Sequence, residues 1–226
     1  MVKENLDASI IIRGFNEAFW LKILFKKLKK QKNVKFEIIY CDNYSDDESI
    51  DLAKKYKIKK IFKFKKHIPG KILNNAVKLA SGKFVVFLSS HCIPVNDNWL
   101  SEHIDFMKKN KSLLASYGRQ IPLPGTSTKD KLDLSIIFRD EDIFSIKDPY
   151  ISNANAIYIR SFLLRNNFSN KASNIEDKIW ALKFAKKKNS IAYNSKSAVF
   201  HHHGVHQHNQ DSKRSINSFN LLERKY

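Results

Sequence analysis

The sequence predicts an α/β fold with a mostly parallel central sheet and helices on both of its faces. Short apolar runs of strand length alternate with longer stretches in which apolar residues recur at helical spacing, and the connections between them are short. Hydrophobic residues make up 42% of the 226 residues, which is enough for a core, and this length is typical of one globular domain. Sheets of this kind bind ligands at the carboxyl ends of their strands.

Four strands are predicted in the first half of the chain. Residues 8–12 and 36–41 are short apolar runs, residues 60–64 form a weaker one, and residues 84–88 form the most apolar run in the sequence. Short runs rich in isoleucine, valine and phenylalanine are typical of buried strands. Because helical stretches separate them, we expect these strands to pair in parallel.

Three helices are predicted between these strands. Residues 17–31 and 70–80 carry apolar side chains at helical spacing, and a Ser-Gly pair ends the second stretch. Between them, Ser45 and Glu48 stand at the spacing of a capping box, which predicts a helix that continues through Tyr56. The side chains expected to face inward from the first and third helices are Leu21, Leu24, Phe25, Leu28, Leu73, Ala76, Val77 and Ala80.

The second half of the chain is less regular. Residues 99–110 and 176–188 are predicted helices, and residues 113–117 and 191–200 are predicted strands. Residues 121–126 contain proline and glycine and are predicted to form a loop. This half has the character of a region that faces a substrate.

The charge of the chain is strongly positive. Lysine and arginine number 41 and aspartate and glutamate 22, which gives a formal net charge of +19. A nucleic acid, an anionic membrane face and a phosphate-bearing substrate all fit such a charge, whereas the apolar content excludes a disordered basic tail.

Neither membrane-spanning segments nor cysteine chemistry are predicted. The longest apolar runs fall far short of the roughly 18 residues that cross a bilayer, and the opening residues show no signal-peptide pattern, so we expect a soluble, cytoplasmic protein. Cys41 and Cys92 have no CxxC spacing, which argues against a disulfide framework or a cysteine zinc site.

Polar residues cluster where three predicted strands end. These are residues 13–17, 42–45 and 89–91, and in a doubly wound sheet they converge on one crevice. A carboxylate there can accept hydrogen bonds from a ribose or a base, while helix N-termini and lysines favour phosphates. The alternative is that Asp42 and Ser45 only cap the second helix. No GxGxxG or GxxxxGK[ST] motif occurs, which argues against a dinucleotide or Walker phosphate loop.

Several segments carry a resemblance to a known family. Residues 9–17 (Ser-Ile-Ile-Ile-Arg-Gly-Phe-Asn-Glu) resemble the opening strand and turn of the family 2 glycosyltransferases. Residues 37–47 look like their second strand, whose terminal aspartate contacts the nucleotide base, and residues 70–76 are similar to the pattern that precedes their fourth strand. Residues 152–156 and the pair Glu176-Asp177 resemble the acceptor-side segment and the catalytic acidic pair.

The resemblance implies a fold and an organisation. The fold is GT-A, a Rossmann-like three-layer α/β/α arrangement. Residues 1–226 are expected to form a single glycosyltransferase domain. About residues 1–120 would bind the nucleotide sugar, and about residues 121–226 would bind the acceptor, supply the base and end in a histidine-rich segment.

One departure from the family concerns metal binding. The fourth strand of most members ends in Asp-x-Asp, which holds a divalent cation, whereas this chain has Ser89-Ser90-His91 there and resembles a branch with Ser-small-His. A divalent cation (Mg²⁺ or Mn²⁺) is a candidate cofactor, with His91 as a ligand and Ser89 as a weak one. His201 and His203 would share one face of a strand end, and the family places a late histidine at the metal. The alternative is a histidine-rich surface that binds nothing specific.

The resemblance also implies roles for individual residues. The catalytic candidates are Asp177, as the base that takes the acceptor proton, and Glu176; adjacent helical residues point about 100° apart, so only one should face the acceptor. The alternative is that this pair opens a helix and complements its dipole. The candidate donor-binding residues are Arg13, Phe15, Glu17, Asp42, Asn43, Lys71, Asn74, Ser89, Ser90 and His91. The candidate acceptor-binding residues are Arg119, Asn153, Asn155 and Trp180, of which Arg119, like Lys71, is also a candidate for contact with phosphate.

The function implied is transfer of a sugar, with inversion, from a nucleotide-sugar donor to a glycan or lipid-linked acceptor, as in bacterial surface polysaccharide synthesis. Lysines in residues 26–32 and 54–66 suggest peripheral docking on the anionic inner face of the cell membrane. Two alternatives stay open, a basic nucleic-acid-binding protein and a nucleotidyltransferase on a similar sheet. We expect no nucleic-acid partner, because no RNP, KH, zinc-finger or helix-turn-helix pattern occurs.

Overall fold

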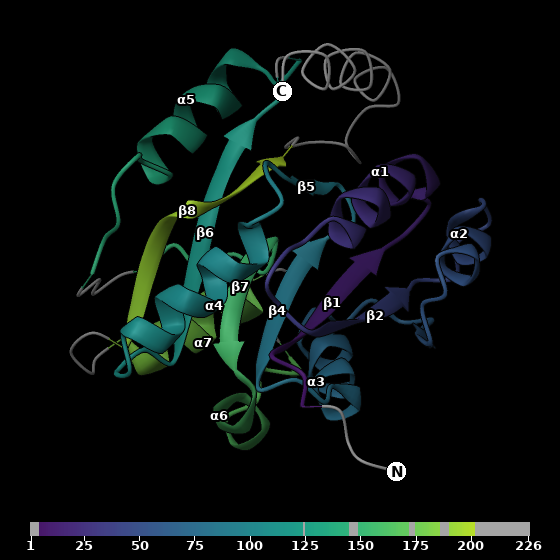
Figure 1. Cartoon of the computed structure of the whole chain (residues 1–226), viewed down its shortest axis with the longest axis horizontal. Coiled ribbons are helices and arrows are strands. Elements are labelled where there is room, and N and C mark those ends of the chain that lie inside the picture. The colour runs from purple at the N-terminus through teal and green to yellow at the C-terminus, as the bar shows by residue number, and fades with distance from the viewer. Residues whose placement is uncertain (1–4, 124, 145–148, 172–174, 186–189, 202–226) are drawn as a thin grey trace.

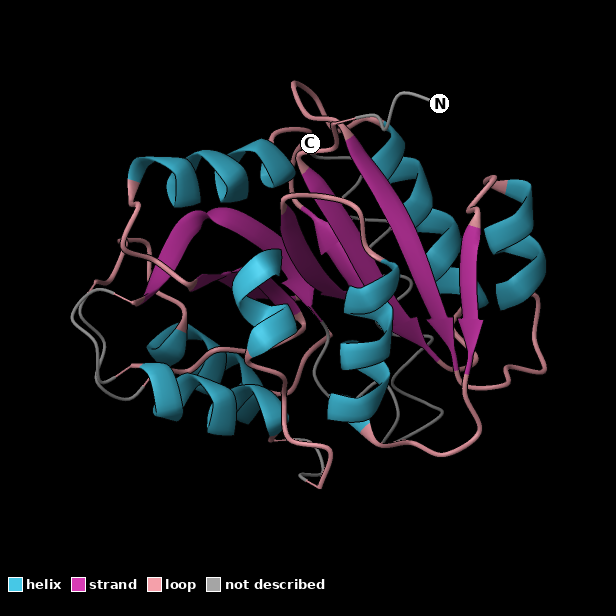
Figure 2. Ribbon diagram, turned by 90° about the horizontal axis from the view of Figure 1, so that it is seen from below, coloured by secondary structure: helices cyan, strands magenta, loops and turns pink. Residues whose placement is uncertain are grey.

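A computed structural model describes residues 5–123, 125–144, 149–171, 175–185 and 190–201. Eight of its strands form one sheet, in the order β3-β2-β1-β4-β7-β6-β8-β5. The sheet runs across the molecule with helices on both sides (Figures 1 and 2), which confirms the predicted α/β fold class. No helix in these ranges is long and apolar enough to cross a membrane.

The first four strands are parallel, as predicted. Their register places the end of β1 directly between the ends of its two neighbours: Arg13 pairs with Cys41 on one side and Ser89 on the other. The carboxyl ends of three strands therefore meet at one edge. The four strands are β1 (Ala8–Gly14), β2 (Phe36–Asp42), β3 (Lys60–Lys63) and β4 (Phe84–Ser89).

The remaining strands make the sheet mixed. β7 (Asn155–Ile159) is antiparallel to β4 and to β6 (Ala115–Pro122), β8 (Ile191–His201) is parallel to β6, and β5 (Cys92–Pro94) is antiparallel to β8. The strand predicted at 113–117 is confirmed as β6 with different bounds, because β6 starts two residues later and runs into the loop predicted at 121–126. β5 and β7 were not predicted as strands.

Seven helices pack against the sheet in the described ranges. The helices α5 and α6 were not predicted, and α5 lacks the amphipathic pattern that would have revealed it, since Leu134 is its only buried residue. The predicted helix at 176–188 ends at Phe184, and residues 186–189 lie outside the described part. The helices are α1 (Ala18–Lys29), α2 (Ser49–Lys55), α3 (Pro69–Leu79), α4 (Trp99–Lys109), α5 (Thr128–Ile137), α6 (Arg160–Arg165) and α7 (Glu176–Phe184).

The predicted capping box before α2 is wrong. Ser45 lies four residues before the helix, and its hydroxyl donates to Asp42 at 2.7 Å and accepts from the backbone N–H of Asn16 at 2.9 Å. Asp47 satisfies the helix termini instead, because its carboxylate accepts from the N–H groups of Ala18 in α1 and Ser49 in α2. One aspartate thus ties the starts of two helices together.

Each face of the sheet carries its own core. Ile10 and Ile12 of β1 point to the face covered by α1, α2 and α4, whereas Ile11 points to the face covered by α3, α5, α6 and α7. The two cysteines are free and buried, and burial raises the pKa of the Cys41 thiol to about 12. Both belong to the packing and not to a reactive site.

Candidate active site

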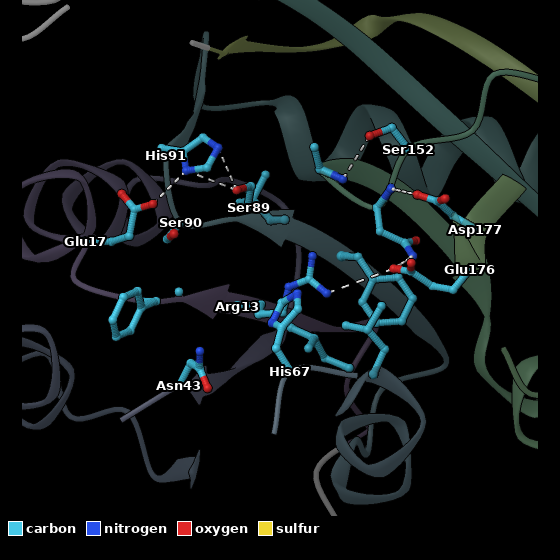
Figure 3. Close-up of a pocket in the computed structure, with 18 of the residues that line it drawn as sticks. Arg13, Glu17, Asn43, His67, Ser89, Ser90, His91, Ser152, Glu176 and Asp177 are labelled. Atoms are coloured by element: carbon cyan, nitrogen blue, oxygen red, sulfur yellow. Dashed lines mark hydrogen bonds and ion pairs between the residues drawn. The ribbon is translucent and has the colours of Figure 1, made fainter. Parts of the chain in front are cut away.

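A cavity of about 390 Å³ lies at the carboxyl ends of β1 and β4, where the sequence predicts a ligand site (Figure 3). It is lined from both halves of the chain, because the start of α7 and the segment before β7 close its far side. The predicted site residues that line it are Arg13, Phe15, Glu17, Asn43, Ser89, Ser90, His91, Asn153, Glu176, Asp177 and His201.

One side of the cavity, which we call the histidine wall, consists of Glu17, Ser89, His91 and His201. His91 Nδ1 lies 2.9 Å from Glu17 Oε1, and its Nε2 lies 3.1 Å from the hydroxyl of Ser89. The His91 and His201 rings stack with centroids 5.2 Å apart. His201 in turn lies 2.6 Å from the side-chain oxygen of Gln120. The wall is thus a continuous chain of polar contacts and one stacked pair of rings.

The opposite side, which we call the acidic wall, consists of Arg13, Asn153, Glu176 and Asp177. Asp177 Oδ2 accepts the backbone N–H of Asn153 at 2.9 Å, which fixes the carboxylate. Glu176 Oε1 lies 4.0 Å from Arg13 Nη1 and 3.4 Å from the side-chain amide of Asn153. Both acidic residues line the cavity, and the expectation that only one of them faces the acceptor stays a prediction.

The surroundings of Asp177 raise the pKa of its carboxyl group. Burial raises the pKa of the Asp177 carboxyl, and the charge of the neighbouring Glu176 raises it further. The N–H groups of Asn153 and Lys178 act in the opposite direction, because they stabilise the carboxylate. A carboxylate with a raised pKa, held in a cavity by a backbone hydrogen bond, is suited to act as a general base.

The third side of the cavity has an aromatic and amide character. Phe15 follows β1 and leaves 46% of its surface exposed, and Asn43 follows β2. Phe64 and His67 complete this side and were not among the predicted site residues. Both follow β3, so their position at the ligand-binding edge of the sheet was the available signal. Ser152 and Ala154 also line the cavity; they belong to the predicted acceptor-side segment, residues 152–156, although neither was singled out there.

Three candidate donor-binding residues lie outside the lining. Asp42 is fully buried, and its carboxylate accepts hydrogen bonds from Tyr40 and Ser45. The side-chain amide of Asn74 donates to the backbone carbonyl of Phe168 and accepts its N–H, both at 3.0 Å. These two hydrogen bonds join the loop after α6 to α3. Lys71 is exposed on the surface of α3. The structure therefore gives Asp42 and Asn74 supporting positions.

Three candidate acceptor-binding residues also lie outside it. Asn155 is fully buried and joins four elements, because its oxygen accepts from Trp99 and pairs with His103 while its amide donates to carbonyls of Arg119 and Ser197. The Arg119 guanidinium forms an ion pair with Asp140. Trp180 is 2% exposed and is one of the residues by which α7 packs into the core.

The described residues do not form a divalent-cation site. No group of three or more His, Cys, Asp and Glu side chains close enough to hold a metal occurs within those ranges. The donor atoms nearest to the expected place are also engaged with one another, since Glu17 and Ser89 both contact the ring of His91. Octahedral Mg²⁺ or Mn²⁺ prefers several free oxygen ligands, which this arrangement does not supply. His203, a further predicted ligand, lies outside the described residues.

Sequence comparison decides the family. A family model described as "Glycosyl transferase family 2" matches residues 9–166, which contain the strands that end at the cavity. The chain belongs to glycosyl transferase family 2. The match confirms the resemblance drawn from the strand-end motifs, while the assignment to a Ser-Ser-His branch of the family stays a prediction.

Individual relatives of this family 2 chain are distant. The poly(ribitol-phosphate) beta-N-acetylglucosaminyltransferase TarS of two Staphylococcus aureus strains is 24% identical over 209 residues. That match covers 85% of this chain and 35% of the relative, so the chain spans about a third of the length of these curated relatives.

Solved structures show the same GT-A fold. S. aureus TarS 1–349 in complex with UDP-GlcNAc superposes with a TM-score of 0.70 at 20% identity, covering 92% of this chain and 61% of that one. The Pyrobaculum calidifontis mannosyltransferase PcManGT, in complex with GDP-Man and Mn²⁺, superposes with a TM-score of 0.70 at 13% identity, covering 99% and 66%. At these identities the likeness establishes the fold.

Proposed function

We propose that this chain transfers a sugar from a nucleotide-sugar donor to an acceptor hydroxyl, with inversion at the anomeric carbon. The observation that carries the proposal is Asp177, a partly buried carboxylate with a raised pKa, which accepts the backbone N–H of Asn153 in the acidic wall of the cavity. Family membership and the GT-A fold support this reaction class.

The proposed chemistry is a single displacement. The acceptor oxygen forms a bond to the anomeric carbon while the bond from that carbon to the diphosphate oxygen breaks, and the diphosphate leaves with the electron pair. The acceptor proton passes to the Asp177 carboxylate, which must therefore be ionised beforehand. Because nucleophile and leaving group lie on opposite sides of the carbon, configuration inverts.

The proposed donor site extends from the aromatic side to the histidine wall. Phe15 offers an exposed ring against which a base can stack, and Asn43 offers both a donor and an acceptor. His67 and His91 also line the cavity and are the side chains that we propose to lie near the diphosphate. Asp42 then supports the site without touching the donor. Its carboxylate accepts the hydroxyl of Ser45, and this hydroxyl accepts the backbone N–H of Asn16, which fixes the turn after β1.

The first and second halves of the chain are proposed to have different roles. Residues up to about 120 bind the nucleotide sugar, and the remainder, within a single domain, supplies Asp177 and the acceptor region around Asn153. The TarS relatives are named for transfer of N-acetylglucosamine to poly(ribitol-phosphate), so we propose UDP-GlcNAc as the first donor to test. As the acceptor we propose a glycan, a lipid-linked acceptor or a phosphate-rich polymer that belongs to bacterial surface polysaccharide. A net charge of +19 suits an anionic acceptor.

The proposal does not include a role for Mg²⁺ or Mn²⁺, and the binding assay below is made with and without Mn²⁺. Mn²⁺ accompanies the donor in the PcManGT structure, but the described residues of this chain do not offer a fitting set of ligands. We therefore assign no step to a metal.

A thermal-shift panel tests the proposed function. UDP, UDP-GlcNAc, GDP and GDP-mannose are added with and without Mn²⁺, and a ligand that binds the folded state raises the melting temperature by mass action. We expect a shift with at least one nucleotide sugar and its matching diphosphate. The absence of a shift with all four, in both conditions, would overturn the proposal.

Docking on an anionic membrane is proposed from the lysine-rich surface. The last turn of α1 carries Lys26, Lys27 and Lys29, and α2, which packs beside α1, carries Lys54 and Lys55 (Figure 1). Each lysine near anionic lipid contributes about 1 kcal/mol. We expect sedimentation with phosphatidylglycerol vesicles that weakens with salt and is absent with phosphatidylcholine vesicles. Sedimentation that ignores salt and lipid charge would contradict it.

A further inference from the structure

Tyr158 of β7 brings a hydroxyl group into an aromatic cluster of the core. The residue is fully buried. Its ring packs edge-on against Phe87, Phe168 and Trp180, with ring centroids 5.3, 5.6 and 5.1 Å away. A phenylalanine would fill the same space without a polar atom, so a tyrosine in such a place needs a partner for its hydroxyl.

The partner of this hydroxyl is a residue of the acidic wall. The Tyr158 hydroxyl donates to the side-chain oxygen of Asn153 at 2.9 Å. Side chains alternate across a strand, so Tyr158, like Ala156, faces the side of the sheet that α7 covers. Asn153 lines the cavity, whereas Tyr158 is not among the lining residues. The hydroxyl therefore contacts the site from within the core.

Asn153 connects this contact to the two carboxylates. Its backbone N–H donates to Asp177 Oδ2 at 2.9 Å, and its side-chain amide donates to Glu176 Oε1 at 3.4 Å (Figure 3). It lies in a turn that is closed by a hydrogen bond of 3.1 Å from the N–H of Asn155 to the carbonyl of Ser152. One residue thus binds both carboxylates of the acidic wall.

The hydroxyl also determines how the Asn153 amide is oriented. Burial and the charges of Asp177 and Glu176 raise the pKa of Tyr158, so the phenol stays protonated and remains a donor. This donor engages the amide oxygen, which directs the NH₂ group toward Glu176. The reversed amide would place its oxygen against a carboxylate, which would repel it.

We propose that Tyr158 is a positioning residue for the base, because it holds Asn153 and, through Asn153, the Asp177 carboxylate in the geometry for proton transfer. The inference rests on the proposed function, which makes Asp177 the base. Without the hydroxyl, the Asn153 side chain would keep the 3.4 Å bond to Glu176 as its remaining hydrogen bond among the described residues. A less firmly placed base lowers the rate of the chemical step and leaves donor binding unchanged.

Titration of Asp177 in the unliganded chain tests the contact without any substrate. Tyr158→Phe removes a single oxygen, which should weaken the hydrogen bond by which Asn153 stabilises the Asp177 carboxylate. The pKa of Asp177 should therefore rise, and we expect its titration midpoint to lie about 0.5 higher on the pH scale than in wild type. Carbon-13 NMR of aspartate carboxyl groups measures the midpoint, with the signal assigned by its loss in Asp177→Asn.

The matched control is Tyr193→Phe. Tyr193 is fully buried in the same core, and its hydroxyl donates to the carbonyl of Arg139 at 2.6 Å, away from the cavity lining. Both variants should lower the melting temperature by a few degrees, but Tyr193→Phe should leave the midpoint of Asp177 in place. Neither variant changes a charge among the ionisable groups that surround Asp177 or line the cavity, which are Arg13, Glu17, His67, His91, Glu176, Lys178 and His201.

Release of UDP from UDP-GlcNAc, with poly(ribitol-phosphate) as acceptor, gives the kinetic measurement. We expect Tyr158→Phe to lower kcat about tenfold while the Kd of UDP-GlcNAc stays within twofold. When Asn153 is already replaced by alanine, the same substitution should change kcat less than twofold, because Tyr158 acts through the Asn153 side chain. Such non-additivity distinguishes a specific contact from a general loss of packing.

The outcomes separate the two levels of the proposal. If no nucleotide or nucleotide sugar binds the wild-type chain and no UDP is released, the proposed function fails and the positioning role with it. If the wild-type chain transfers sugar but Tyr158→Phe keeps both its kcat and the midpoint of Asp177, the positioning role alone is overturned. Equal effects of Tyr158→Phe and Tyr193→Phe, or additive losses of kcat with Asn153→Ala, also overturn it, because the Tyr158 hydroxyl would then have a structural role only.

Discussion

The two walls of the cavity differ in how their polar atoms are satisfied. In the histidine wall, Glu17, Ser89 and His91 contact one another, and His201 stacks on His91 and reaches Gln120. In the acidic wall, Arg13 and Glu176 form an ion pair at 4.0 Å, and Arg13 Nη1 and Glu176 Oε2 are buried without hydrogen-bond partners among the described residues. The histidine wall is therefore organised before any ligand arrives, whereas the Arg13–Glu176 pair of the acidic wall is only loosely joined.

The largest expected effect comes from removing the base of the acidic wall. We expect Asp177→Asn to lower kcat by about 10²–10⁴-fold, because the acceptor proton loses its carboxylate. The Kd of the nucleotide-sugar donor should stay within twofold, since Asp177 is proposed to act on the acceptor. Steady-state kinetics and calorimetry measure the two quantities.

Asp105→Asn is the matched control, because Asp105 is an exposed aspartate on α4 and does not line the cavity. It should retain wild-type kcat. Full activity in Asp177→Asn would remove Asp177 from the mechanism and leave Glu176 as the remaining carboxylate of this wall.

A smaller effect is expected from opening the histidine wall. His91→Asn removes the ring that joins Glu17 and Ser89 and stacks on His201, so a buried carboxylate loses a partner. We expect nucleoside diphosphate binding to weaken about tenfold and the melting temperature to fall by a few degrees. Calorimetry and thermal denaturation report these changes.

The contrast between the walls predicts that the donor bound to His91→Asn still reacts, with kcat reduced less than in Asp177→Asn. A kcat loss in His91→Asn as large as that in Asp177→Asn would show that the histidine wall takes part in the chemistry and does not only bind the donor. His103→Asn is an unsuitable control because His103 is buried against Asn155.

The sequence predicted the parallel half of the fold well, for a physical reason. The central residues of β1, β2 and β4 are mostly apolar and buried, so their pattern is unambiguous, and the polar residues at their ends mark the ligand edge. Arg13 and His91 could be assigned to a common site on that basis alone.

The remaining features depend on contacts that no local pattern shows. The antiparallel β7 is recognisable only through its pairing with β4 and β6. Asn155 and Trp180 are of residue types that are common in binding sites, but contacts with distant parts of the chain bury both of them in the core. The ion pair of Arg13 and Glu176 joins positions far apart in sequence, so only the folded chain reveals it.

The pH dependence of activity tests the electrostatics of the acidic wall. Because burial and Glu176 raise the pKa of Asp177, the acid limb of kcat should lie above the usual range of an aspartate, which is about pH 4. Below that pKa, kcat should fall about tenfold per pH unit, since the base is protonated. A pH–rate profile at saturating donor and acceptor measures it.

Glu176→Gln provides the internal comparison for this profile. Removing the neighbouring negative charge should move the acid limb toward lower pH, whatever the absolute activity of the variant. An acid limb that stays in place would mean that burial alone sets the pKa of Asp177. A limb that moves upward would contradict the assigned direction of the Glu176 effect.

The smallest expected effect is on stability, and its sign follows from the same raised pKa. A folded-state pKa above the unfolded value means that the protonated carboxyl is favoured by folding, so this stabilisation is complete below the unfolded pKa and is lost as pH rises through the folded pKa. At pH 7.5 the ionised Asp177 therefore costs stability. We expect Asp177→Asn to melt about 2 °C higher than wild type there, because its side-chain oxygen still accepts the N–H of Asn153.

The gain should shrink as pH falls through the raised pKa, since wild-type Asp177 then becomes neutral as well. Thermal denaturation of both proteins at several pH values measures the difference, with Asp105→Asn as the exposed control. A variant that melts lower than wild type at every pH would show that the Asp177 carboxylate holds the acidic wall together. In that case the acidic wall, like the histidine wall, would be organised before its ligand arrives.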